Sequence, residues 1–274
     1  MADLSTGYRL GSGARDSGHR LHVHDRLGST NAEAMALARA GEAGPLWIAA
    51  RRQEAGRGRR GNVWDSVPGN LAASVLWPAT GIEPEQLATL GFVAGGALTE
   101  ALGAACGTAP DVTEAGAERP FRLKWPNDVL IGSAKLAGIL LETETLPGRR
   151  RAVVIGFGVN VAGVPATQID RAASLAGSGY VTDAGALLAH LSDRFAAVAS
   201  AWDRGRGFAG IRQRWLARAA GLGGPIAVET GTVTLRGRFD GIDEGGRLVI
   251  HAPDDTRHTV TAGEVHFGTA ATAA

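Results

Sequence analysis

The sequence predicts an α/β main domain followed by a small β domain. Short apolar segments at 46–50, 71–77 and 152–161 have the length and composition of buried strands, and helical segments whose apolar residues recur every three or four positions lie between and after them. After Gly221 the chain reads Gly-Leu-Gly-Gly-Pro, which is typical of a linker, and short strand-like segments follow. These observations predict a flexible N-terminal arm over 1–20, a main domain over 21–221 and a small barrel over 222–270.

The beginning of the chain is expected to form an arm, a strand and a helix. Residues 1–20 are rich in glycine, serine and arginine and lack the apolar segment of a secretory signal. Residues 22–24 alternate like a strand, and a helix follows in which Thr30 begins a capping-box pattern and Gly41 ends the helix. Ser29 and Thr30 therefore have two interpretations. They cap the helix, which the residues alone favour, or they form a polar pocket for the oxygens of a ligand.

The segment 51–61 is the most distinctive part of the sequence, with five arginines and three glycines in eleven residues. Glycine lets the backbone approach a ligand closely, and arginine offers a planar set of donors to phosphate or carboxylate, so the segment predicts a mobile anion clamp. It also matches G-x-G-x-x-G, but no helix begins at the loop, and no acidic residue ends a strand about 20 positions later, as a dinucleotide-binding fold requires. A solvated basic loop or a nucleic-acid-binding patch remains open as an alternative.

A predicted hairpin over 121–142 is the second informative segment. The two strands meet at a turn at 132–133, and Pro126 interrupts the first, so that Asn127 and Asp128 are aimed into a site. Lys124 and Lys135 lie within otherwise apolar strands, where a lysine either extends to solvent, pairs with a structural acid or contacts a ligand.

The remaining elements complete the predicted core. A long helix opens at 83–85 and carries apolar residues to Leu102, and the buried strand 152–161 ends beside Asn160, whose amide could contact the edge of a base. Two amphipathic helices precede the linker. The β segment of about 45 residues that follows is too small to be very stable alone, so we expect it to dock on the main domain.

Composition limits the functional classes. The chain has 28 basic and 27 acidic residues and a net charge of +1, which argues against a protein that coats nucleic acid. The single cysteine, Cys106, excludes an internal disulfide and suits a reducing cytoplasm. No apolar run reaches the roughly 18 residues of a membrane span.

Three separated segments together resemble one family, the bacterial biotin–protein ligases. They are Ser-Thr-Asn at 29–31, Gln-Glu-Ala-Gly-Arg-Gly-Arg-Arg-Gly at 53–61 with Trp64, and Lys-Trp-Pro-Asn-Asp at 124–128 with Lys-Leu-Ala-Gly-Ile-Leu at 135–140. The resemblance extends over roughly 22–267. It implies a class II synthetase-like or biotin–lipoate ligase-like fold: a mixed, largely antiparallel sheet flanked by helices, with a small SH3-like C-terminal barrel.

The resemblance also implies the reaction. ATP and biotin would give biotinyl-5′-AMP and pyrophosphate, and biotin would pass to one lysine of the biotin carboxyl carrier protein of acetyl-CoA carboxylase or a related carboxylase. Mg²⁺ would accompany ATP, with no tightly bound cofactor. We expect a cytoplasmic monomer or weak homodimer, with no membrane partner. No DNA partner is expected either, because the residues before His22 are too few to build the helix-turn-helix domain that some relatives carry.

Site residues are carried over from the family by position. The implied catalytic residues are Arg57, Arg59, Lys135 and Asp128. The implied biotin contacts are Ser29, Thr30, Asn31, Gln53, Gly56, Arg57, Gly58, Arg59, Lys135 and Gly138. The implied contacts with ATP or the adenylate are Arg60, Trp64, Lys124, Asn127, Asp128 and Asn160, with Asp128 also assigned to Mg²⁺.

Two positions depart from the family pattern. Asn62 stands where many relatives have a basic residue, and Phe157 stands where a smaller residue is usual. A lipoate–protein ligase of related fold is the nearest alternative function, and a nucleic-acid-binding module is the alternative from another class. The sequence does not specify the acceptor carboxylase, the oligomeric state or the kinetic constants.

Overall fold

A computed structural model describes residues 7–108, 119–231 and 233–267. Its main domain is a seven-stranded sheet in the order β1-β2-β3-β7-β6-β5-β4. Only β1 and β2 pair in parallel, so the sheet is mixed and largely antiparallel, as the resemblance implies. Its strands are β1 (Arg20–Leu27), β2 (Leu46–Gln53), β3 (Leu71–Pro78), β4 (Phe121–Lys124), β5 (Asp128–Ile131), β6 (Ala134–Thr145) and β7 (Arg151–Val159).

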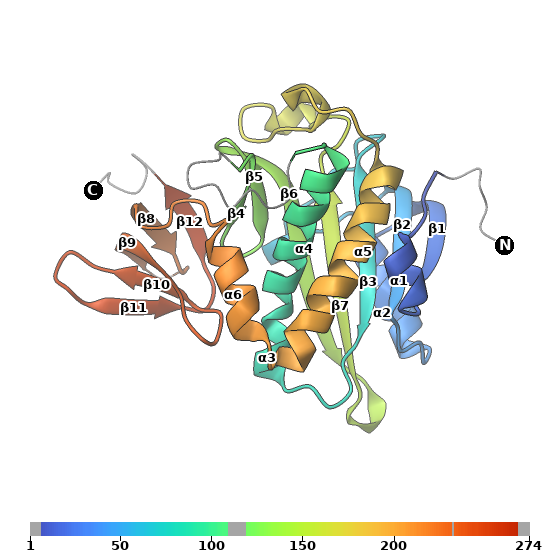
Figure 1. The fold of residues 1–274 in the computed structure, drawn as a ribbon, viewed down its shortest axis with the longest axis horizontal. Coiled ribbons are helices and arrows are strands. Elements are labelled where there is room, and N and C mark those ends of the chain that lie inside the picture. The colour runs from blue at the N-terminus through green and yellow to red at the C-terminus, as the bar shows by residue number, and fades with distance from the viewer. Residues whose placement is uncertain (1–6, 109–118, 232, 268–274) are drawn as a thin grey trace.

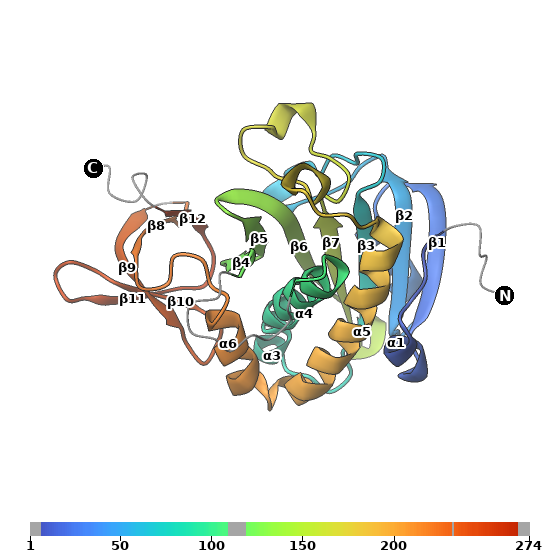
Figure 2. The ribbon, with the colours of Figure 1, turned by 45° about the horizontal axis from the view of Figure 1, so that its top comes forward.

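Helices cover the two faces of the sheet unequally. The α-helices are α1 (Ser12–Asp16), α2 (Thr30–Arg39), α3 (Pro84–Ala88), α4 (Leu90–Ala105), α5 (Ala184–Trp202) and α6 (Phe208–Leu216). The 3₁₀ turns are η1 (Arg59–Gly61), η2 (Pro147–Arg149), η3 (Ala166–Gln168), η4 (Ala176–Ser178) and η5 (Asp203–Gly205). Figures 1 and 2 show α4 and α5 side by side across one face of the sheet. The shorter α2 packs against β2, β3 and β7.

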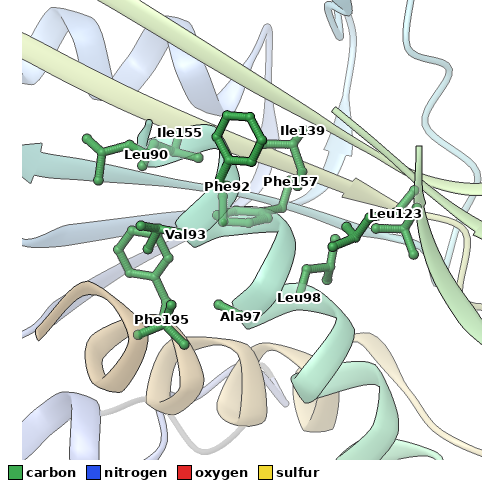
Figure 3. Close-up of a cluster of buried hydrophobic side chains, with 14 of the residues drawn as sticks. Leu90, Phe92, Val93, Ala97, Leu98, Leu123, Ile139, Ile155, Phe157 and Phe195 are labelled. Atoms are coloured by element: carbon green, nitrogen blue, oxygen red, sulfur yellow. The ribbon is translucent and has the colours of Figure 1, made fainter. Parts of the chain in front are cut away.

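The alternation of side chains along β2 explains this arrangement. Trp47 and Ala49 belong to the large core beneath α4 and α5, whereas Leu46 and Ile48 belong to a second cluster with Ala34 of α2. Figure 3 shows the large core, where Phe92, Val93 and Leu98 of α4 approach Ile139, Ile155 and Phe157 of the sheet. On the opposite face, α2 covers only part of the sheet. Leu140 and the glycines of β7 lie on the part that α2 leaves uncovered, where they line a pocket that is open to a ligand.

The departure at Phe157 is explained by this core. Its side chain is 2% exposed, and its ring centroid lies 5.8 Å from that of Trp47 and 6.2 Å from that of Phe195. The ring therefore fills the helix-covered side of the sheet, opposite the open face. A larger residue is accommodated there beside Trp47 and Phe195, and Phe157 is at the same time one of the residues that line the pocket on the open face.

The prediction of a flexible arm over 1–20 is wrong for the described part, which begins at Gly7. Helix α1 packs on α5, with Ala14 fully buried. The backbone N–H of Gly11 donates to Ser192 Oγ at 2.9 Å, and that of Ala14 donates to Asp193 Oδ1 at 2.8 Å. A Cβ at Gly11 would lie 2.1 Å from the Asp193 carboxyl group, so this glycine permits close packing.

The single long helix predicted from 83 onward is divided at Thr89 into α3 and α4. The Thr89 hydroxyl accepts a hydrogen bond of 2.7 Å from the indole of Trp202. Together, Pro84–Ala105 are long and apolar enough to cross a membrane, but 72% of the most apolar stretch is buried inside the protein. This is the behaviour of a core helix in a globular protein.

The C-terminal part is an antiparallel sheet in the order β11-β10-β9-β8-β12. Its strands are β8 (Pro225–Glu229), β9 (Thr234–Ile242), β10 (Leu248–His251), β11 (Arg257–Val260) and β12 (Glu264–Phe267). The strand-like segments predicted from the sequence include β8 to β11 but not β12. Figures 1 and 2 place this sheet beside β4 and α6, at the opposite end of the molecule from β1.

Candidate active site

A pocket of about 420 Å³ opens on the uncovered face of the main sheet. Its floor comes from β6 and β7, one wall from the start of α2, another from the arginine loop (54–64), and a third from the segment at 124–128. The C-terminal sheet closes it with residues 263–265. The predicted site residues that line it are Ser29, Thr30, Asn31, Gln53, Arg57, Gly58, Arg59, Arg60, Trp64, Lys124, Asn127, Asp128, Lys135 and Gly138.

The start of α2 supplies a polar wall. Ser29 is the N-cap and accepts from the N–H of Ala32 at 3.4 Å, so the capping interpretation holds for Ser29. Thr30 does not act as the N-cap that the capping-box pattern predicts. Its N–H and hydroxyl both lie near Gln53 Oε1, at 2.8 and 3.1 Å. Helix start and strand end are therefore joined at the pocket.

Asn31 lies deeper and is 3% exposed. Its Nδ2 donates to Glu142 Oε2 at 2.7 Å and to the carbonyl of Leu140 at 3.2 Å, and its Oδ1 accepts from Ser74 Oγ at 2.6 Å. A Cβ at Gly156 would lie 2.2 Å from Asn31 Oδ1, so this close approach requires glycine in β7. Asn31 thus supports the wall from below.

The arginine loop is folded back on itself. Trp64 N–H donates to the carbonyl of Gly56 at 2.9 Å, and Gly58 N–H donates to that of Asn62 at 2.7 Å. Arg60 has a φ of 54°, a left-handed conformation that few residues other than glycine adopt. Its guanidinium lies 3.9 Å from Glu264 of β12. The loop is thereby set between the main sheet and the C-terminal sheet.

Trp64 lies directly on glycine backbone. A Cβ at Gly158 would approach its indole to 2.4 Å, and a Cβ at Gly138 would approach it to 3.3 Å. The Nζ of Lys135 is 5.9 Å from the centroid of the indole ring. Because Gly138 and Gly158 on neighbouring strands have no side chains, the indole ring of Trp64 can lie flat against the sheet, beside the cation of Lys135.

Cations converge on the pocket from three elements. Lys135 Nζ lies 2.7 Å from Asp128 Oδ1, Lys124 Nζ lies 6.0 Å from the ring centroid of Phe267 in the C-terminal sheet, and Arg59 donates to Asn127 Oδ1 at 3.1 Å. Of the 28 lysine and arginine residues, only Lys124 and Lys135 are lysines, and both line this pocket.

Arg59 is partly withdrawn from solvent beside another cation. Burial, and then the neighbouring Arg60, lower the pKa of its guanidinium, while Asp128 and Glu264 act in the opposite direction. An arginine stays protonated despite such a shift, so Arg59 is a cation that has lost hydration without gaining a full counter-charge. An anionic group in the pocket would supply it.

Two predicted site residues do not line the pocket. Gly56 is a buried residue of the arginine loop, where a Cβ would lie 2.3 Å from the carbonyl of Trp64. Asn160 is 3% exposed; its Oδ1 accepts from Asn70 at 3.2 Å, and its Nδ2 donates to the carbonyl of Ala173 at 3.2 Å. Both residues hold loops in place beside the pocket.

Several functional residues are missed by the sequence analysis. Gln168 and residues 263–265 line the pocket, and Ser74 and Glu142 hold its wall through hydrogen bonds. A weak signal exists for Ser74 and Glu142, because each is a polar residue on a strand that is otherwise largely apolar. No sequence pattern connects 263–265 to the pocket, since that contact depends on how the C-terminal sheet docks.

Metal binding by side chains alone is not supported. Within the described ranges, no group of three or more His, Cys, Asp and Glu residues is placed to hold an ion. The carboxylates that line the pocket are those of Asp128 and Glu264, and Asp128, next to Asn127 and the pocket cations, fits a hard cation that takes its other ligands from a bound phosphate.

Comparisons with known proteins agree with this geometry. Residues 26–160 match the Biotin/lipoate A/B protein ligase family, and residues 221–268 match the Biotin protein ligase C terminal domain. The chain is 44% identical to the biotin–[acetyl-CoA-carboxylase] ligase of Paracoccus denitrificans over 250 residues, covering 89% of this chain and 98% of that protein. It is 30% identical to the enzyme of the same name from Mycobacterium tuberculosis, covering 92% and 91%.

Solved structures show the same fold. The biotin protein ligase of Aquifex aeolicus in complex with biotin and ATP has a TM-score of 0.73 at 24% identity, covering 91% of this chain and 99% of that chain. The biotin protein ligase of Leishmania major in complex with biotinyl-5-AMP has a TM-score of 0.62 at 21% identity, covering 89% and 99%. Because it is at least 30% identical to both ligases over nine tenths or more of their length, the chain belongs to the biotin protein ligase family.

Proposed function

We propose that this protein is an ATP-dependent biotin–[acetyl-CoA-carboxylase] ligase. It activates biotin as biotinyl-5′-AMP and transfers the biotinyl group to one lysine of a biotin carboxyl carrier protein. The observation that carries the proposal is the convergence of Arg59, Lys124 and Lys135 on one pocket whose opposite wall is the polar helix start at Ser29 and Thr30. One end of the pocket suits a polar uncharged ring and the other suits phosphates.

The first half-reaction brings two anions together. A carboxylate oxygen of biotin attacks the α-phosphorus of ATP, the bond to the bridging oxygen breaks, and pyrophosphate leaves with the bonding electrons. Lys135 and Arg59 offset the repulsion between the carboxylate and the phosphate and stabilise the charge that develops on the phosphoryl oxygens. Lys135 has three donor hydrogens, so its bond to Asp128 leaves two for the substrates.

The second half-reaction consumes the mixed anhydride. The neutral amine of the carrier lysine attacks the acyl carbon, AMP leaves with the electrons of the cleaved C–O bond, and the amine nitrogen loses a proton. The arginine loop has to exclude water from the anhydride until the carrier arrives. We infer that the loop, although folded in the free protein, opens more often there than with the adenylate bound, because its like charges repel until an anion neutralises them.

Mg²⁺ fits this site as a companion of ATP. Asp128 would hold it together with the nucleotide phosphates, and the ion would neutralise part of the phosphate charge. The assignments of individual contacts remain part of the proposal. These include Gln53 and Gly138 to biotin, and Trp64, Lys124 and Asn127 to the nucleotide.

The remaining expectations concern surroundings and partners. We propose that the acceptor is the carrier protein of acetyl-CoA carboxylase or a related carboxylase, and that the enzyme works in the cytoplasm as a monomer or weak homodimer. The single free cysteine, Cys106, supports a reducing compartment, and the balanced net charge of +1 supports the absence of DNA binding.

The test is a mass measurement on a carrier domain. The protein is mixed with ATP, Mg²⁺, biotin and the carrier, and we expect the carrier to gain one biotinyl group. A carrier whose acceptor lysine is replaced by arginine, and a mixture without ATP, serve as controls. Lipoate replaces biotin in a parallel mixture and in a thermal-shift comparison. Transfer of lipoate in preference to biotin, or no gain with either acid, would overturn the proposal.

A further inference from the structure

We propose that Glu142 is a positioning residue that anchors the arginine loop through Arg57. The positive charge of Arg57 then serves to hold the loop, and the charge that meets the substrate comes from Arg59 and Lys135. The kinetic part of this inference rests on the proposed function. The structural part concerns the free protein and stands independently of it.

The ion pair itself is well defined. Arg57 donates to Glu142 Oε2 at 3.1 Å, with the two side chains 48% and 30% exposed. An isolated surface pair of this kind contributes little, because ordering two long side chains costs conformational entropy. Glu142 differs from such a case because the same Oε2 accepts from Asn31 Nδ2 at 2.7 Å. Since Asn31 is buried, the carboxylate is already fixed when Arg57 reaches it.

The anchor continues into the floor of the pocket. Asn31 Oδ1 lies 2.6 Å from Ser74 Oγ, which lies 2.7 Å from Thr30 Oγ1, and Thr30 contacts Gln53. This chain of hydrogen bonds joins the two proposed biotin contacts, Thr30 and Gln53, to the arginine loop. Ser74 has one proton to share between Thr30 and Asn31, so a change in the bonding of Thr30 alters the bonding of Asn31.

The position of Glu142 on β6 explains why it can act in this way. Leu140 lines the pocket, and Glu142 lies two residues further on the same face, just outside the lining. Its carboxylate can therefore hold the loop without occupying substrate space. Glu144, two residues further again, pairs with Arg39 of α2, away from the loop. Glu144 is thus a control on the same strand and face.

The first test measures amide hydrogen exchange in the arginine loop of the ligand-free protein. The reporting amides are those of Gly58, Asn62 and Trp64, whose hydrogen bonds close the loop. Glu142→Gln keeps the side-chain shape and removes the charge, and Arg57→Gln removes its partner. We expect each to accelerate exchange by about tenfold, the double variant to go no further, and Glu144→Gln to leave exchange unchanged. Unchanged exchange in Glu142→Gln, or additive effects, would overturn the anchor.

The second test separates loop positioning from direct action on the substrate. In Glu142→Gln, which changes a residue outside the pocket lining, we expect dissociation of biotinyl-AMP to be faster by about tenfold, with the single-turnover rate of adenylate formation at saturating ATP and biotin unchanged. If Arg57→Gln slows adenylate formation and Glu142→Gln does not, Arg57 acts on the substrate and the inference is wrong. If the unmodified protein forms no adenylate, the proposed function fails, and the exchange measurement alone decides the role of Glu142.

Discussion

At the scale of single residues, the three cations that converge on the pocket differ in their partners before any substrate arrives. Lys135 has a carboxylate partner, with Asp128 Oδ1 at 2.7 Å. Arg59 contacts the uncharged Asn127, and Lys124 contacts the ring of Phe267. Under the proposed function, the ammonium of Lys135 holds the biotin carboxylate and the α-phosphate together only while both are charged, which is the situation in the first half-reaction alone.

We therefore expect Lys135→Ala to impair adenylate formation far more than transfer. Loss of one preorganised charge contact costs on the order of 3 kcal/mol, or roughly a hundredfold in rate. The measurement is carrier mass gain under single-turnover conditions, started either from biotin and ATP or from preformed biotinyl-AMP. Equal losses in both, with an unchanged circular dichroism spectrum, would show that Lys135 acts in both steps or shapes the pocket.

The glycine seat of Trp64 gives a second prediction. Gly158→Ala places a methyl group where the indole lies, so the ring must move away from β7. Overpacking of this kind costs about 1–3 kcal/mol, and we expect the KM for ATP to rise by about tenfold or more. Gly210→Ala is the matched control, because Gly210 is exposed on α6 and has no atom within 4 Å of the new methyl group. A normal KM in Gly158→Ala would exclude Trp64 from nucleotide binding.

The sequence predicts the charged residues of the pocket better than it predicts the residues that position the pocket walls through hydrogen bonds. Arg59, Lys124 and Lys135 lie in short motifs whose composition is unusual for a loop or a strand. Ser74 and Glu142 act only because β3 and β6 are brought to either side of β7, and no local pattern encodes that pairing. Asn160 shows the reverse case: its motif position predicts a ligand contact, and in the ligand-free structure its amide bonds to Asn70 and Ala173.

At the scale of elements, the N-terminal segment has a larger role than its composition suggests. His19 follows α1 and is 7% exposed, and its Nδ1 accepts a hydrogen bond of 3.0 Å from the indole of Trp47. Burial lowers the pKa of His19, and Asp193 offsets this only in part. The folded protein therefore favours the neutral imidazole, which ties α1 to the edge of the main sheet.

This arrangement predicts acid sensitivity. Because the folded-state pKa of His19 lies below its unfolded value, its stabilising contribution is complete above about pH 6.5 and is lost as the pH falls through the folded pKa. We expect the free energy of unfolding, from urea titrations at pH 7.5 and pH 5, to fall more in the unmodified protein than in His19→Gln. His190→Gln, at an exposed position on α5, is the control. An equal decrease in the free energy of unfolding in all three proteins would show that His19 does not contribute to the acid sensitivity.

Element prediction from periodicity succeeds where apolar spacing is regular and fails where long-range contacts decide. The seven strands of the main sheet and helices α2, α4, α5 and α6 follow patterns that the sequence shows. Helix α1 does not, because the hydrogen bonds that hold it come from Ser192 and Asp193, at sequence separations of 181 and 179 residues. The division of α3 from α4 falls at Thr89, whose hydroxyl accepts a hydrogen bond from the distant Trp202.

At the scale of the whole molecule, the two sheets form one site. Residues 263–265 close the pocket, and Arg212 of α6 holds the C-terminal sheet by donating to the carbonyl of Ile242 at 2.6 Å. The indole of Trp125, on the pocket wall, lies 3.4 Å from the carbonyl of Gly246 in the same sheet. Docking of the small sheet is therefore part of the construction of the pocket.

We expect Arg212→Gln to loosen this docking. A hydrogen bond from a charged donor contributes about 1.5–3 kcal/mol, and its loss should accelerate amide exchange in β12 and raise the KM for ATP while β2 and β3 stay protected. Arg214→Gln changes an exposed arginine two residues further along α6 and should have neither effect. If exchange in β12 is unaltered, the sheets are held together by their apolar contacts alone.

The placement of both lysines inside the pocket has a consequence for the chemistry of self-labelling. Arginine guanidinium groups are not acylated by a mixed anhydride, so the outer surface offers escaping biotinyl-AMP no lysine amine. Arg59→Gly should open the pocket and release the intermediate, and streptavidin blots should then show biotin on bystander proteins. The enzyme itself should stay nearly unmarked, and intact-mass spectrometry should find at most its terminal amine and the pocket lysines modified. Heavy modification elsewhere would contradict this expectation. A variant that releases biotinyl-AMP would therefore biotinylate neighbouring proteins, and streptavidin would recover those proteins with little of the ligase itself.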